Sequence, residues 1–187
     1  MHSHWRFFEA LDDDLHRLAR YIEPVPDNFN CYSTEIARLF LSTCSETDVV
    51  LRMICRSLND EKASSISSYR TTVTSRYTHF CHTKVEIPEY GISIRPWEHW
   101  LTQDSPSWWQ DYNKVKHQRD AYFGRSSLYN LLAASGGLLV ALFYQSQDVL
   151  YTEGFTPRFR FMHFHSEWAQ IMRFGYTYTH PEFRQLG

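Results

Sequence analysis

Long apolar runs are scarce in this sequence of 187 residues, and so are glycine and proline. Seven residues of each leave little room for low-complexity linkers, and an aromatic content of 17% argues against disorder. The most membrane-like stretch, Leu128 to Tyr144, is shorter than the roughly 20 residues that a span needs, and Asn130 interrupts it. Met1 to Arg6 lacks the apolar run of a signal peptide. We therefore expect a cytoplasmic protein without membrane contact, in which residues 128–144 form a buried helix.

Cysteine is also sparse. The four cysteines are scattered and show no CxxC spacing, which argues against a disulfide framework and against a zinc site. Helical spacing puts Cys44 and Cys55 on or beside an apolar face, where free thiols behave as small hydrophobic groups.

Neither sign of charge predominates, because the net charge is −2 and the pI is near 6.5. Binding to phosphate must therefore come from a local patch. The acidic run Asp12-Asp13-Asp14 points in three directions on a helix, so we interpret it as a solvated face. His163 and His165 would share one face of a strand, but no acidic or thiol partner is close to them in sequence. We expect no bound metal and no cofactor.

Apolar periodicity predicts one mainly helical domain over residues 1–187. The predicted core helices cover about residues 3–22, 33–58, 106–123 and 126–145, and Ser33 and Ser126 are the expected caps of the second and the fourth. This pattern predicts an all-α four-helix bundle.

Two segments depart from this pattern. Residues 59–104 are an insertion, in which we expect a short helix from Ile66 to Tyr77. Val85, Ile87, Ile92 and Ile94 alternate around a proline and a glycine, which indicates an irregular excursion or a small hairpin. Residues 150–187 form an aromatic C-terminal extension, with a strand-like alternation up to His165 and a short helix expected from Ser166 to Phe174.

The most informative stretch lies in the third predicted helix. Asn113 and His117 are four residues apart and Lys116 is three from Asn113, so helical spacing puts all three on one face, flanked by Tyr112 and Arg119. An imidazole that titrates near neutral pH can move protons, and an amide can orient it or bind a phosphate oxygen.

Lys114, Lys116 and Arg119 can place positive charge on the non-bridging phosphate oxygens. The alternative is a structural role, in which Asn113 and His117 hydrogen-bond into the tryptophan-rich loop from Trp97 to Trp109.

The sequence from Tyr112 to Asp120 resembles the HEPN superfamily. Its members are all-α helical bundles, and many are metal-independent ribonucleases of toxin–antitoxin, abortive-infection and CRISPR effector systems. The family signature is an arginine, a polar residue that is often asparagine, three further residues and a histidine. Asn113, Lys114 and His117 match it, whereas Tyr112 stands where the catalytic arginine would be and Asp120 lies one residue beyond the usual acidic position.

The resemblance implies a symmetric homodimer with two motifs across one cleft, His117 and Asn113 as catalytic residues, and Lys114, Lys116, Arg119 and Tyr112 as the RNA- or phosphate-binding residues. The expected function is cleavage of single-stranded RNA in bacterial defence, with an antitoxin or another defence protein as partner. One alternative, favoured by Tyr112, is a catalytically degenerate dimer that binds RNA or a nucleotide or regulates a partner. Another is an unrelated helical protein whose aromatic surface serves assembly.

Overall fold

Helices form most of the protein, as predicted. The computed structural model describes residues 2–102, 105–146, 159–165, 169–172 and 175–178. Within these residues lie six α-helices: α1 (His2–Ala19), α2 (Thr34–Ser57), α3 (Ile66–Arg76), α4 (Ser107–His117), α5 (Arg119–Tyr122) and α6 (Leu128–Gln145). A small three-stranded antiparallel sheet accompanies them. The expectation of a largely helical fold is confirmed, and the assignment to the HEPN fold stays a prediction.

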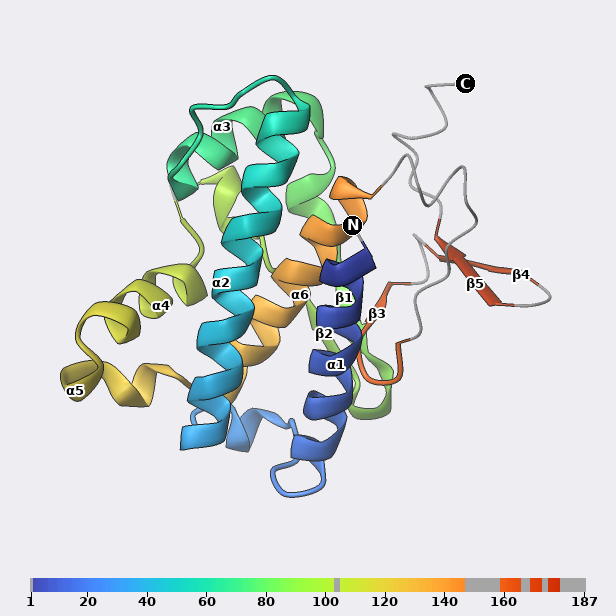
Figure 1. The fold of residues 1–187 in the computed structure, drawn as a ribbon. Coiled ribbons are helices and arrows are strands. Elements are labelled where there is room, and N and C mark those ends of the chain that lie inside the picture. The colour runs from blue at the N-terminus through green and yellow to red at the C-terminus, as the bar shows by residue number, and fades with distance from the viewer. Residues whose placement is uncertain (1, 103–104, 147–158, 166–168, 173–174, 179–187) are drawn as a thin grey trace.

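The core is built around α6. Figure 1 shows α2 and α6 running side by side, with α1 beside them, and α4 packs against both α2 and α6. By length and composition α6 is apolar enough to cross a membrane, but 89% of it is buried inside the protein. It is therefore the core helix of this fold, as predicted, whereas the cytoplasmic location stays a prediction.

Small residues at the middle of α6 let neighbouring elements approach closely. A Cβ atom added to Gly136 would lie 2.6 Å from Cγ2 of Val85, and one added to Gly137 would lie 2.9 Å from the ring of Trp108. Such separations leave no room for a side chain, so both contacts depend on glycine.

Capping defines the start of both long helices. The Ser33 hydroxyl accepts a hydrogen bond from the backbone N–H of Ile36 at 3.1 Å, which confirms the predicted start of α2. The cap of α6 is Ser127, whose hydroxyl accepts from the N–H of Asn130 at 3.3 Å, one residue later than the predicted Ser126.

The interpretation of the acidic run in α1 as fully solvated is wrong at its first residue. Asp12 is only 1% exposed, and its carboxylate accepts three backbone hydrogen bonds, from Arg160 at 2.6 Å, Phe161 at 3.0 Å and Met162 at 2.9 Å. Burial raises the pKa of Asp12, although these three donors lower it. The side chain therefore fastens the segment after residue 158 to α1.

The insertion between α2 and α4 contains the predicted elements. Helix α3 fills residues 66–76, and β1 (Val85–Ile87) pairs with β2 (Ile92–Ile94) as an antiparallel hairpin. Strand β3 (His163–Phe164) pairs with the other edge of β1, so the sheet order is β2-β1-β3. Val85 of β1 packs against Gly136 of α6, so the sheet covers one side of the core.

The C-terminal extension differs from its prediction. Where the structure describes it, the segment expected to form a short helix contains β4 (Ala169–Met172), which pairs with β5 (Gly175–Tyr178) in an antiparallel hairpin. Residues 166–168 and 173–174 of that predicted helix lie outside the described residues. In β5 tyrosine alternates with glycine and threonine, which is a strand pattern rather than a helical one.

Candidate functional site

One face of α4 holds the helix rigidly in the core. Trp108, Trp109, Tyr112 and Val115 are all buried, and the indole N–H of Trp108 donates to the carbonyl oxygen of Pro96 at 2.9 Å. Their spacing of three and four residues gives a helix with one apolar face. The packing of these buried side chains therefore fixes the orientation of α4 and the direction in which its other face points.

The opposite face presents Asn113 and His117 to solvent. Both side chains are exposed and lie four residues apart, and α4 ends at His117. Neither side chain makes a hydrogen bond or ion pair within the described part of the chain. The structural alternative, in which the two residues bond into the tryptophan-rich loop, thus finds no support among these residues.

The predicted helix over residues 106–123 is interrupted, so this boundary is wrong. Gln118 adopts φ −143° and ψ 56°, which ends α4, and a separate short helix α5 begins at Arg119. The N–H of Gln118 still closes the last turn by donating to the carbonyl oxygen of Lys114 at 2.8 Å. Arg119 is exposed, but the helical spacing of α4 no longer determines where it lies.

Two of the predicted phosphate-binding lysines already make contacts on α4. Nζ of Lys114 lies 3.1 Å from Oδ1 of Asp111, and Nζ of Lys116 lies 5.4 Å from the centre of the Tyr112 ring. Lys116 thus lies nearer the core side of the helix than Asn113 and His117 do. Both lysines are exposed, and an exposed ion pair or cation–π contact contributes at most about 1 kcal/mol, so a phosphate can compete for either ammonium group.

Tyr112 occupies a core position rather than a surface position. It is 6% exposed, and its ring makes edge contacts with Trp109 at 5.4 Å and Phe40 at 6.4 Å between ring centres. Burial raises the pKa of its hydroxyl to about 12. A ring packed in this way has no open face for a nucleobase, so the site that we propose omits Tyr112.

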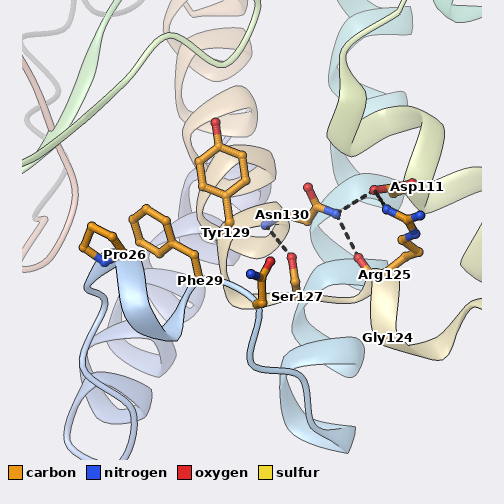
Figure 2. Close-up of a pocket in the computed structure, with 9 residues that line it drawn as sticks. Pro26, Phe29, Asp111, Gly124, Arg125, Ser127, Tyr129 and Asn130 are labelled. Carbon is orange, nitrogen blue, oxygen red and sulfur yellow. Dashed lines mark hydrogen bonds and ion pairs between the residues drawn. The ribbon is translucent and has the colours of Figure 1, made fainter.

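An anchor that the sequence did not predict joins α4 to α6. The amide nitrogen of Asn130 donates to Oδ2 of Asp111 at 3.1 Å and to the carbonyl oxygen of Arg125 at 2.8 Å (Figure 2). Asn130 is the polar residue that interrupts the apolar stretch 128–144, and this interruption is the sequence feature that indicates a buried hydrogen bond. Its partners could not be identified because they lie 19 and 5 residues earlier in the chain.

The two histidines predicted to share a strand face lie at β3. The strand itself covers His163 and Phe164, and Nε2 of His165 lies 3.1 Å from Oε1 of Glu86, a partner that was distant in sequence. No group of three or more metal-ligating side chains gathers within the residues that the structure describes.

Comparisons with known proteins identify no relative of this chain: no family model, no curated protein and no solved structure matches it. The resemblance to HEPN proteins therefore rests on the sequence match at Asn113, Lys114 and His117 alone, and membership of that family stays a prediction.

Proposed function

We propose that the protein is a HEPN-like endoribonuclease that cleaves single-stranded RNA without a metal ion, with the exposed face of α4 as its active surface. The observation that carries this proposal is the presentation of Asn113 and His117. They stand together in solvent, without partners among the described residues, on a helix whose other face is fixed by buried aromatic rings. A catalytic group works best when its supporting element is rigid.

The reaction needs two proton transfers and positive charge. A base removes the proton of the ribose 2′-hydroxyl, whose oxygen attacks the adjacent phosphorus, and an acid protonates the departing 5′-oxygen. The products are a 2′,3′-cyclic phosphate and a free 5′-hydroxyl. His117 serves one of these proton transfers, Asn113 binds a phosphate oxygen or orients the imidazole, and Lys114, Lys116 and Arg119 stabilise the charge on the phosphorane.

One histidine per chain suits one proton transfer at a time, so we propose that two chains act together. In a two-fold dimer the same face of each chain meets its counterpart, and two copies of His117 then supply both acid and base. Exposure of the whole Asn113–His117 face is compatible with that arrangement. In the proposed biological context, bacterial defence, an antitoxin or another defence protein would control access to this face.

A second candidate function follows from Tyr112. The residue at the position of the family's catalytic arginine is part of the core, so each chain lacks one cation at that point of the motif. A dimer that binds RNA or a nucleotide, or regulates a partner protein, without cutting RNA would need only the exposed cations.

The two functions separate in one experiment. End-labelled single-stranded RNA is incubated with the purified protein in EDTA, and both the cleavage products and the bound fraction are measured. Cleavage that depends on His117 supports the nuclease, and binding without cleavage supports the second function. The matched control is His16→Ala, because His16 is also an exposed histidine on a helix but lies on α1.

A further inference from the structure

A pocket of about 460 Å³ opens beside the start of α6 (Figure 2). Its walls come from η1 (Pro26–Asn28) and the residues after it, from Asp111 of α4, and from the segment between Gly124 and Asn130. Pockets for small molecules typically measure about 300–1,000 Å³. The volume therefore fits a small ligand such as a mononucleotide.

The pocket is already formed by backbone contacts. The N–H of Leu128 donates to the carbonyl oxygen of Cys31 at 2.8 Å, and the N–H of Tyr129 donates to the carbonyl oxygen of Phe29 at 3.0 Å. These bonds fix the loop after η1 to the first turn of α6. Because they also use the free N–H groups of that turn, the end of α6 is not itself an anion site.

One wall is aromatic. The rings of Phe29 and Tyr129 lie 5.4 Å apart between centres and are tilted by 48°, with Pro26 next to them. Tyr129 is 41% exposed although it stands at the start of the core helix. An exposed tyrosine ring beside a pocket is a surface on which a planar heteroaromatic ring can stack.

The other wall offers hydrogen-bond acceptors. Both amide hydrogens of Asn130 are directed at oxygen atoms, of Asp111 and of Arg125, which fixes the orientation of the amide and leaves Oδ1 without a partner in the described residues. The carboxylate of Asp111 accepts one bond on each oxygen, from Asn130 and Lys114, and so keeps about two of its four acceptor positions. A ligand edge that meets these oxygen atoms of Asp111 and Asn130 must donate.

A cation stands at the rim. Nη1 of Arg125 lies 4.0 Å from Oδ2 of Asp111, and the Arg125 side chain is 60% exposed. The guanidinium group can pair with an anionic ligand group in solvent while the acceptors below hold a neutral ring edge.

From these features we propose that the pocket binds a guanine nucleotide. Guanine carries adjacent ring N–H and amino donors on one edge, which match the acceptors of Asp111 and Asn130, and its ring stacks on Tyr129 while Arg125 binds the phosphate. Adenine presents an acceptor at the corresponding ring nitrogen and fits this wall less well. Asp111 lies two residues before Asn113, which is about 200° around α4. The pocket therefore does not include Asn113 or His117, although Lys114, which we assign to the nuclease site, donates to Oδ1 of Asp111. Its occupancy does not depend on RNA cleavage.

The test is calorimetric titration of the full-length protein with GMP, AMP and guanosine at low salt. We expect saturable GMP binding and weaker AMP binding. Tyr129→Ala should weaken GMP binding by about 5- to 150-fold, which corresponds to the loss of one base stack. Tyr122→Ala is the matched control, because Tyr122 is another exposed tyrosine, at 36%, that does not line the pocket.

Arg125→Gln separates the phosphate from the base: it should weaken GMP binding and leave guanosine binding unchanged. Thermal melting of each variant establishes that it is folded. The proposal is overturned by the absence of saturable GMP binding at millimolar concentration, by equal affinities for GMP and AMP, or by Tyr129→Ala and Tyr122→Ala having the same effect.

Discussion

Replacing Tyr112 by arginine restores the residue of the HEPN signature, and we expect it to damage this protein rather than to activate it. The side chain is 6% exposed, packs edge-on against Trp109 and Phe40, and has the ammonium group of Lys116 over its ring. An arginine at this position would place a guanidinium group among apolar rings and next to another cation.

The cost can be worked out from these contacts. Removing a buried aromatic side chain typically costs about 3–5 kcal/mol. The aliphatic stem of arginine recovers part of the packing if the charged end reaches solvent. We therefore expect a net loss of about 2–4 kcal/mol, which for a chain of this length lowers Tm by about 4–16 °C.

Thermal unfolding followed by circular dichroism measures this loss. Tyr112→Phe is the control, because it keeps the ring and removes only the hydroxyl, and we expect it to change the free energy of unfolding by no more than about 1 kcal/mol. If Tyr112→Arg melts within about 2 °C of the wild type, the assignment of Tyr112 to the core is mistaken. If it cleaves RNA faster than the wild type, a missing cation limits the activity.

Three further predictions concern packing, a buried carboxylate and assembly. Gly136→Ala should destabilise the protein by about 1–3 kcal/mol in urea unfolding, because the added methyl group would collide with Val85. Gly124→Ala is the control and should be nearly neutral, because the nearest atom would lie 3.6 Å from its added methyl group. Equal effects of the two substitutions would contradict the packing of the sheet on α6. Asp12→Ala should cost about 3–5 kcal/mol because three backbone donors lose their acceptor. The pKa of Asp12 is raised in the folded protein, so this carboxyl contributes stability at acid pH that is lost as the pH rises through that pKa. The free energy of unfolding of Asp12→Asn, measured across pH, should lack this pH-dependent contribution. Light scattering should find a dimer at micromolar concentration, and a monomer alone would argue against two chains sharing one site.

Periodicity in the sequence was sufficient to predict the helices. The apolar stripe of α2 and its cap at Ser33 are properties of neighbouring residues, and so is the alternation that forms the β1–β2 hairpin. The same helical spacing also indicates where Tyr112 lies. Tyr112 follows Trp108 by four residues and precedes Val115 by three, which places it on the buried face of α4.

Other features depend on residues that are far apart in the chain. Asp12 turns inward because it meets backbone N–H groups about 150 residues later, and the short local sequence of α1 cannot show this. The break at Gln118 has neither glycine nor proline at that residue to signal it. Asp111 and Asn130 pair only once α4 has packed on α6, so the anchor and the pocket emerged from the structure.

The most direct test of the central claim is the rate of RNA cleavage in EDTA by His117→Ala against that of the wild type, at equal concentration. His117 is exposed, so the variant should unfold at the same temperature as the wild type and lose about 10²–10⁴ in rate, as expected for loss of an acid–base group. Asn113→Ala should lose less. Cleavage by His117→Ala at the wild-type rate, or no cleavage by the wild type itself, would contradict the assignment of the α4 face as a nuclease site.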